Sequence, residues 1–326
     1  MFRTTSARSP LAVLTATAVA GVAIASGTTS AIAASTGAAP AVTPTGATSA
    51  LEGRNTATVR RALTEFYGQG RTERVGQFFA GDYIEHDPTV GAGRAGLVAA
   101  VKARQALNPR PVATIKHVLA EGSLVAVHSH VSPTPADEFS GQAAIELFRL
   151  AGNRIVEHWR FAQAVPATSA SGNTMFSDLY RYDGPAPTLS RAAEEANKQL
   201  TLKIWPAVFM ARDLTAIDRY WAPGDTYLQH NPRIPNGTAG LRGFLASMPP
   251  TVSQNRFAIA DGDLVLTINQ SIPTTADLSS DYLGSAVADI YRIAGGRAVE
   301  HWDVVQPVPA TSANGNSIFS SLYQER

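Results

Sequence analysis

Asp289 is the residue whose type and position point most directly to chemistry. It is an acid within a predicted strand of otherwise apolar residues, and Glu146 occupies the same place in a related stretch earlier in the chain. Burying an unpaired charge is unfavourable, so such an acid needs a partner or a function. A carboxylate in an apolar pocket can act as a general base, because desolvation raises its pKa towards neutrality. The alternative is a salt bridge from Asp289 to Arg292, Arg297 or another cation.

Two histidines lie in similar turns that contain proline. His230 belongs to YLQHNP (227–232) and His86 belongs to YIEHDP (83–88). An imidazole here can either hydrogen-bond to a ligand in a pocket or cap backbone groups at the turn. Both interpretations stay open at this point.

Composition excludes several classes of site. The chain has no cysteine, which rules out disulfides, thiol nucleophiles and thiolate metal ligands. Its 27 basic and 26 acidic residues are well mixed, and no basic run indicates nucleic acid as a partner. His128 and His130 share a strand face, but no third ligand follows at a recognisable spacing. We therefore expect no metal and no cofactor.

Strand alternation decides which side chains can share a cavity. In the predicted strand 297–306, Glu300 and His301 fall on opposite faces. We interpret Glu300 and Glu157 as structural partners of a helix end. Trp302 and Trp159 are expected to be core residues. One face of the strand holds Ala298, Glu300, Trp302, Val304 and Gln306, and the other holds Val299, His301, Asp303 and Val305.

The candidate residues belong to a segment that occurs twice. VEHWRFAQAVPATSASGNTMFSDLY begins at Val156, and VEHWDVVQPVPATSANGNSIFSSLY begins at Val299, with 17 of 25 positions identical. Earlier landmarks are spaced by about 140 residues as well, which is far longer than the unit of a solenoid. The sequence therefore predicts a duplicated domain.

Each copy has helical periodicity first and β-branched runs afterwards. In the first copy, helical patterns precede the predicted strands 117–130, 142–150 and 154–165, and a third helix is expected over 96–106. Ser190 is a plausible N-cap for the helix that opens the second copy. Helices followed by antiparallel strands predict an α+β fold.

These stretches resemble a known family. ADIYRIAGGRAVEHWDVVQPVP (288–309), SANGNSIFS (312–320) and the turn YLQHNP are similar to SnoaL-like proteins of the NTF2-like superfamily, a group that includes polyketide cyclases. The resemblance implies two tandem cone-shaped α+β barrels, each a curved antiparallel sheet wrapped on helices around an apolar pocket. It also implies that domains 1 and 2 pair through their sheets.

The resemblance further implies that the face with Glu300, Trp302 and Gln306 looks into the pocket. A catalytic aspartate of the family sits four residues after the tryptophan, where this chain has Gln163 and Gln306. We expect a small apolar carbonyl compound as ligand and cofactor-free aldol condensation, cyclisation or isomerisation as the reaction. Asp289 would be the base, with His230 and Gln306 as hydrogen-bond donors. Residues expected to bind the substrate are Trp302, Glu300, Tyr291, Tyr227, His86, Glu146, Trp159 and Gln163. A non-catalytic binding or interaction module is the alternative.

The N-terminus predicts export. Basic residues, a short apolar run and Ala31-Ile-Ala33 are typical of a secretory signal, and an uncleaved membrane anchor is the alternative. We expect a secreted, extracellular or envelope-associated protein that has no membrane contact after cleavage. The expected segments are a signal peptide (1–33), a flexible leader (34–53), domain 1 (54–182), a linker (183–190) and domain 2 (191–326).

Overall fold

The structure is a computed structural model of the chain, and it describes residues 49–249 and 251–322. The predicted signal peptide and most of the predicted leader lie outside these residues. Two related parts follow, here called the first half (residues 49–182) and the second half (residues 183–322). None of the described helices combines the length and the hydrophobicity needed to cross a membrane.

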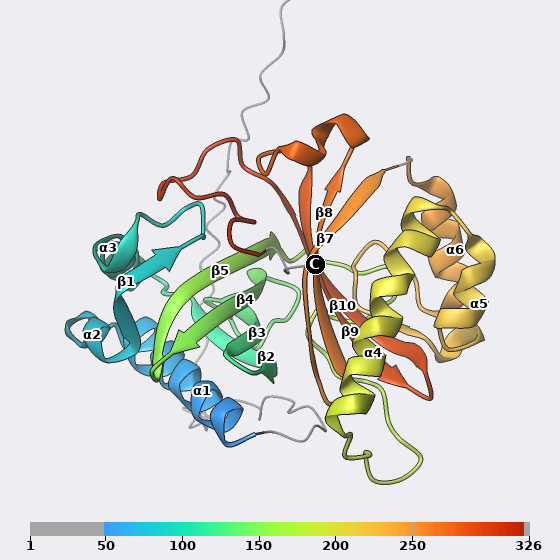
Figure 1. The fold of residues 1–326 in the computed structure, drawn as a ribbon, viewed down its shortest axis with the longest axis horizontal. Helices are drawn as coiled ribbons and strands as arrows, with labels where there is room; N and C mark the ends of the chain where they lie inside the picture. The colour runs from blue at the N-terminus through green and yellow to red at the C-terminus, as the bar shows by residue number, and fades with distance from the viewer. Residues whose placement is uncertain (1–48, 250, 323–326) are drawn as a thin grey trace, which may run out of the picture. The chain divides into compact units, whose positions relative to one another are not determined.

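Both halves place helices before the long strands (Figure 1). The first half contains α1 (Ala50–Arg61), a π-helical turn η1 (Ala62–Gly68), η2 (Thr72–Arg74), α2 (Val75–Phe78), β1 (Phe79–Glu85), α3 (Gly93–Gln105), β2 (Val112–Glu121), β3 (Leu124–Ser132), β4 (Gln142–Ala151) and β5 (Arg154–Ala164). The second half contains α4 (Arg191–Ile204), a π-helical turn η3 (Trp205–Met210), η4 (Leu214–Ala216), α5 (Ile217–Tyr220), η5 (Gly224–Thr226), β6 (Leu228–Gln229), α6 (Gly237–Ser247), β7 (Val252–Asp261), β8 (Leu264–Ile272), η6 (Thr275–Ser279), β9 (Ser285–Ala294) and β10 (Arg297–Pro307).

The first helix begins before the predicted domain start at residue 54. Ser49 and Glu52 form a capping box, in which each side chain accepts the other residue's backbone N–H at 3.2 and 2.7 Å. These bonds satisfy donors at the helix start, so residues assigned to the leader belong to the folded part. In the second half, Ser190 caps α4 by accepting the N–H of Ala193 at 3.3 Å, which confirms the predicted N-cap.

The two halves contain five-stranded sheets with the same strand order, β1-β5-β4-β3-β2 and β6-β10-β9-β8-β7. Four strands of each sheet are antiparallel, but β1 and β6 pair in parallel with β5 and β10, so each sheet is mixed at one edge. Left-handed backbone at Gly152 and Asn153, and at Gly295 and Gly296, forms the tight turns that join β4 to β5 and β9 to β10. The α+β fold is confirmed, and the shared strand order is consistent with a duplicated unit.

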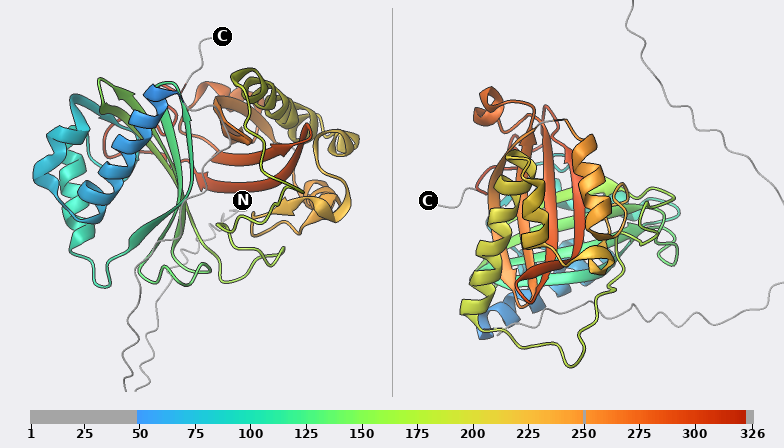
Figure 2. Two further views of the ribbon diagram at one scale, coloured as in Figure 1. Left: turned by 90° about the horizontal axis from the view of Figure 1, so that it is seen from below. Right: turned by 90° about the vertical axis from the view of Figure 1, so that its right-hand side faces the viewer.

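The helices of each half lie against one face of that half's sheet, as Figures 1 and 2 show. The other faces of both sheets contribute to one buried apolar cluster, which includes Leu147 and Trp159 from the first half and Ile290 and Trp302 from the second. Both faces of the central strands are therefore buried, which is unusual for antiparallel strands and gives them long apolar runs.

Two glutamines connect the sheets in a reciprocal way. The side-chain oxygen of Gln163 accepts the backbone N–H of Val305 at 2.8 Å, and that of Gln306 accepts the N–H of Ala162 at 2.7 Å. Each glutamine satisfies a backbone donor of the opposite sheet, so both are structural at this contact.

Each half ends in a tail that contacts the other half. The indole N–H of Trp302 donates to the carbonyl oxygen of Ser177, and that of Trp159 donates to Ser320, both at 2.9 Å. Each tail therefore packs against the opposite half. The indole N–H of the core tryptophan in each half has its acceptor in the tail of the other half. The first tail is residues 165–182 and the second tail is residues 308–322.

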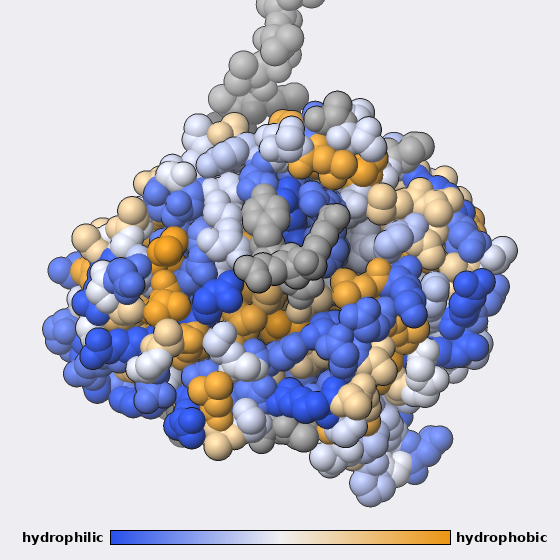
Figure 3. Space-filling model, in the orientation of Figure 1, coloured by the Kyte–Doolittle hydropathy of each residue, from blue (hydrophilic) through white to orange (hydrophobic). Residues whose placement is uncertain are grey.

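The surface carries both hydrophobic and hydrophilic residues. On the face drawn in Figure 3, the hydrophobic areas are small and separated by hydrophilic side chains. This distribution agrees with the even mixture of charges along the sequence.

Candidate functional site

A cavity of about 420 Å³ lies in the second half, bounded by the helices and by β8, β9 and β10. Ligand pockets commonly have volumes of about 300–1,000 Å³. The cavity walls are largely apolar and include Phe209, Trp221, Leu241, Phe244 and Met248. A few polar groups converge on the sheet side, and they are the candidates for chemistry.

Strand β10 faces the cavity with His301 and Asp303, and not with Trp302 and Gln306. The prediction that the Glu/Trp/Gln face looks into the pocket is therefore wrong. Trp302 lies instead in the cluster between the sheets, where its side chain is fully buried. Alternation separates the two faces of a strand correctly, but it does not identify the cavity face when both are buried.

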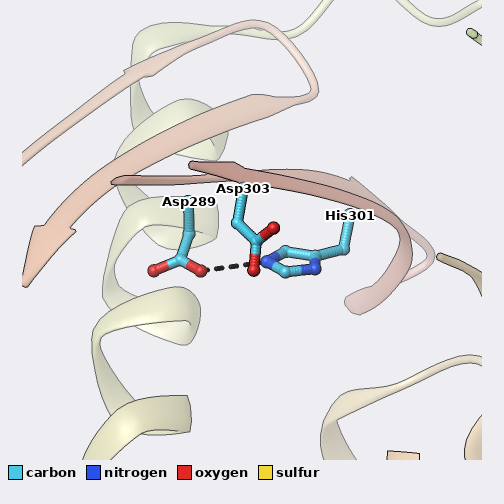
Figure 4. A group of neighbouring side chains, drawn as sticks. All are labelled: Asp289, His301 and Asp303. Carbon is cyan, nitrogen blue, oxygen red and sulfur yellow. Dashed lines mark hydrogen bonds and ion pairs between the residues drawn. The ribbon is translucent and has the colours of Figure 1, made fainter. Parts of the chain in front are cut away.

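Asp289 lines the cavity from β9 and accepts several hydrogen bonds. Its Oδ2 accepts the indole N–H of Trp205 at 3.2 Å and the amide of Asn269 at 3.1 Å, and its Oδ1 lies 3.0 Å from Nε2 of His301 (Figure 4). The salt bridge to Arg292 is not formed, because that guanidinium pairs with three carboxylates elsewhere. The cation that pairs with Asp289 is instead the imidazole of His301. Asp289 therefore faces the cavity as a hydrogen-bonded carboxylate.

Gln229 fixes the protonation pattern of His301. The Oε1 atom of Gln229 accepts the backbone N–H groups of His230 at 2.9 Å and Asn231 at 2.8 Å, so it is an acceptor, and Nδ1 of His301 must donate to it at 2.9 Å. Nε2 of His301 then faces the carboxylate of Asp289, and that contact is favourable only with a proton between them. The His301–Asp289 pair therefore holds a proton at the cavity wall.

Asp303 lies opposite Asp289 in the β9–β10 ladder and on the same face (Figure 4). Its Oδ2 accepts the amide of Asn231 at 2.6 Å, whereas its Oδ1 is buried without a hydrogen-bond partner among the described residues. Burial raises the pKa of Asp303 to about 6; the positive charge of His301 opposes this shift and the charge of Asp289 adds to it. A carboxyl group that titrates near neutral pH and presents an unpaired oxygen can take or give a proton.

Asp303 was not among the residues predicted for the site. It lies opposite Asp289 because a bulge between Ala298 and Glu300 shifts the register by one residue, whereas regular pairing from the turn would place Trp302 there. It was missed because the face that carries Asp303 was assigned to the outside of the pocket.

Two tyrosines also line the cavity, and both were predicted to bind substrate. The Tyr227 hydroxyl accepts a hydrogen bond from the Gln229 amide at 3.0 Å. The Tyr291 ring lies 4.5 Å from the His301 ring, centroid to centroid. Burial raises the pKa of Tyr227 and Tyr291 well above the ordinary value, so both keep their protons and can donate to a ligand oxygen.

The structure does not bring His230 or Gln306 to Asp289. His230 stacks on Trp302 with ring centroids 5.0 Å apart, and it contacts Glu300 at 2.9 Å and a backbone oxygen of the first tail at 2.7 Å. Gln229, the preceding residue on β6, points into the cavity, so the side chain of His230 points to the other side of the sheet. The expectation that His230 and Gln306 share a pocket with Asp289 is wrong, and Glu300 and Trp302 likewise lie outside the cavity.

The first half contains a related cluster. Nδ1 of His158 lies 2.9 Å from Glu85, and its Nε2 lies 3.4 Å from Glu146. Glu146 lines a cavity of the first half, whereas His86 stacks on Trp159 at 4.8 Å between ring centroids, outside it. Trp159 itself belongs to the cluster between the sheets. Gln163 bonds across the sheets and also lines the cavity of the second half.

We expect the His158 cluster to make stability depend on pH. Burial disfavours the charged ring, but Glu85 and Glu146 outweigh it and raise the pKa of His158 to about 10. A histidine with a raised pKa contributes stability fully below the pKa of the unfolded chain, about 6.5, and loses it as pH rises towards the folded value. His158→Gln should therefore destabilise the protein by a few kcal/mol near pH 6 and much less near pH 10. Denaturant unfolding of both forms at the two pH values measures this difference, and an equal difference at both would contradict the assignment.

The cluster of Figure 4 also has the composition of a cation site. One ligand atom each from Asp289, His301 and Asp303 lies within 4.8 Å of the others. Carboxylate and imidazole donors suit several divalent metals. However, both nitrogens of His301 already make hydrogen bonds, and a cation would have to displace Asp289 from one of them. The expectation of no metal and no cofactor stays a prediction.

A mixed five-stranded sheet covered by helices, with a cavity between them, defines an α+β fold. Within that fold class, residues 57–169 match the family model described as SnoaL-like polyketide cyclase, which confirms the resemblance for the first half. No curated protein matches the chain.

Several solved structures are similar to part of the chain. A candidate polyketide cyclase from Bacillus cereus is 20% identical over 34% of this chain and 74% of its own, with a TM-score of 0.30. A candidate SnoaL-like polyketide cyclase from Jannaschia is 22% identical over 36% and 90%, with a TM-score of 0.31. An NTF2-like protein of unknown function from Mesorhizobium loti is 12% identical over 36% and 98%, with a TM-score of 0.31.

Proposed function

We propose that the second half binds a small, largely apolar carbonyl compound and moves a proton at the carbon next to its carbonyl group, without a cofactor. The observation that carries this proposal is the unpaired, buried carboxyl oxygen of Asp303 in an apolar cavity that also holds two protonated tyrosines. The family matched by the first half includes polyketide cyclases, which agrees with a ligand of this kind.

The residues have separate roles in such a reaction. Oδ1 of Asp303 removes a proton from the carbon next to the carbonyl, and the electron pair moves onto the carbonyl oxygen. Tyr227 and Tyr291 donate hydrogen bonds to that oxygen and stabilise the enolate. The enolate carbon then attacks a second carbonyl of the same ligand, which closes a ring. In a ligand with a double bond conjugated to the enolate, the far carbon of that double bond takes the proton instead, which gives an isomer. In both cases the proton on Asp303 returns to the product.

The His301–Asp289 pair acts on Asp303 through its charge in this scheme and does not contact the reacting atoms. Its imidazole nitrogens are both engaged by Gln229 and Asp289. A positive ring beside Asp303 limits how far burial raises the pKa of that carboxyl, which keeps the base ionised near neutral pH. Asp289, predicted as the base, is thus assigned a supporting role, because its two oxygens already accept hydrogen bonds from protein donors.

Turnover should rise with pH through about 6, because Asp303 must be ionised to act as a base. The measurement is a screen of apolar 1,3- and 1,5-dicarbonyl compounds by thermal shift, followed by product analysis of each binder across pH 5 to pH 8. A binder that is never converted at any pH would leave only the alternative function, a non-catalytic binding module. A compound converted with no change across this pH range would contradict the role of Asp303.

Export and duplication belong to the same proposal. Cleavage after Ala33 would release a secreted chain whose halves derive from one ancestral unit and remain paired in solution. N-terminal sequencing of the protein from culture medium tests the cleavage site, and a chain that keeps residues 1–33 and stays with membranes would favour the anchor instead.

A further inference from the structure

The first half contains two adjoining cavities of about 290 and 250 Å³ whose lining differs in charge from the cavity of the second half. Both are bordered by Tyr67, Arg104, Glu146 and Arg160, and the larger one also by Arg110. Apolar residues such as Leu63, Ile115 and Val131 line the remaining walls. The space is suited to a small molecule with a charged end and an apolar body.

Equivalent positions carry opposite chemistry in the two halves. Arg160 lies opposite Glu146 in the β4–β5 ladder, as Asp303 lies opposite Asp289 in the β9–β10 ladder. The second cavity therefore has the carboxylate of Asp303 at the position where the first has the guanidinium group of Arg160. Arg104 likewise stands as far from the start of α3 as Met248 stands from the start of α6, so a second cation replaces an apolar residue of the wall.

Several donors around the first-half cavities have no acceptor among the described residues. The guanidinium group of Arg104 makes no hydrogen bond or ion pair with the described residues, although the side chain is half-buried. The hydroxyls of Tyr67 and Ser129 are buried and also unpaired. Arg160 donates to a single amide, that of Gln142, at 3.1 Å. Buried donors without partners are rare in folded proteins and indicate a missing acceptor.

The neighbouring acids do not supply that acceptor. Glu146 forms its ion pair with His158 at 3.4 Å, and Glu85 is held by the other nitrogen of the same ring at 2.9 Å. Asp87 lies 3.8 Å from Arg160, too far for a hydrogen bond. The two arginines and two hydroxyls therefore leave an unmatched set of donors around one space.

We propose that the first half is a second binding site, which takes a small molecule with a carboxylate head group and an apolar body. Arg104 and Arg160 pair with the carboxylate, Tyr67 or Ser129 donates to its remaining lone pair, and the apolar body lies against Leu63 and Val131. Guanidinium groups bind planar carboxylates with two parallel hydrogen bonds, which suits this head group. The site is independent of the reaction proposed for the second half.

Isothermal titration calorimetry of the full chain with 2-naphthoate and with the uncharged 2-naphthamide tests the proposal. Naphthoate should bind, and naphthamide should bind at least about tenfold more weakly, because a charge-assisted hydrogen bond is lost. Arg104→Met, which copies the residue of the second half, should weaken naphthoate by about tenfold or more and leave naphthamide unchanged. Tyr67→Phe should weaken naphthoate without any change in charge.

The matched control is Arg154→Met, which removes an exposed arginine from the same strand as Arg160. Its naphthoate affinity should equal that of the unchanged protein. Equal affinity for both naphthalene compounds, or equal losses in Arg104→Met and Arg154→Met, would overturn the proposal. Because the readout is binding and not turnover, this failure is distinguishable from a failure of the function proposed for the second half.

Discussion

Asp303→Asn should reduce turnover of a bound carbonyl compound by about 10²- to 10⁴-fold while changing its affinity only slightly. The amide has the shape of the carboxyl group and can still interact with Asn231, but it cannot accept a proton from carbon. The cavity and its apolar walls are unchanged, so the ligand should still bind. Asp303 would thus show the separation of binding from catalysis that is expected of a general base.

Steady-state kinetics and calorimetry on the same preparations measure these two effects. Asp82→Asn is the matched control, since it makes the same chemical change at an exposed position on β1. Asp289→Asn is a useful comparison, because the neutral amide cannot hold the proton shared with His301 and should shift the pH profile of turnover. If Asp303→Asn keeps full turnover, the base is another group and the proposed mechanism fails.

Glu300→Gln should destabilise the fold by about 3–5 kcal/mol, the typical effect of breaking a buried ion pair by removing one partner. Glu300 is fully buried, and its carboxylate accepts the backbone N–H groups of Leu179 at 2.7 Å and Tyr180 at 3.2 Å. It also contacts His230 at 2.9 Å and Arg292 at 3.3 Å. The neutral amide leaves the buried guanidinium of Arg292 short of negative charge and weakens the anchor of the first tail.

Denaturant unfolding followed by tryptophan fluorescence measures this effect. Glu195→Gln is the control, because Glu195 pairs with Lys198 on the surface of α4 and exposes half of its side chain. Exposed pairs contribute about 0–1 kcal/mol, so the control should unfold almost like the unchanged protein. Equal stability of the two variants would show that Glu300 does not hold the first tail to the second half.

The elements of the fold were largely predictable because their signals are local. The cap at Ser190 and the alternation of β10 from Glu300 onwards depend on neighbouring residues, and the structure confirms both. A bulge between Ala298 and Glu300 interrupts the alternation before that point. The capping box at Ser49 was missed because the composition around it is that of a linker. A short Ser-x-x-Glu motif was the available signal.

The candidate site was only partly predictable. Asp289 and the two tyrosines could be placed in the cavity because an acid within an apolar strand is rare and its face neighbours follow from alternation. The choice between the two faces of β10 depends on which one the second sheet covers, and that contact joins residues more than a hundred positions apart. The roles first given to His230 and Gln306 therefore failed, although the residues themselves are important to the structure.

The exchange of tails has a consequence for how the protein can be divided. A fragment that stops at residue 182 would keep Trp159 and His86 but lose Ser320 and Ser317, whose carbonyl oxygens contact these rings. Its own tail would in turn have no surface to cover. We expect neither fragment to fold well when it is expressed alone. Co-expression of the two fragments should restore folding of both, because a break in the chain is tolerated only when the two pieces can still associate.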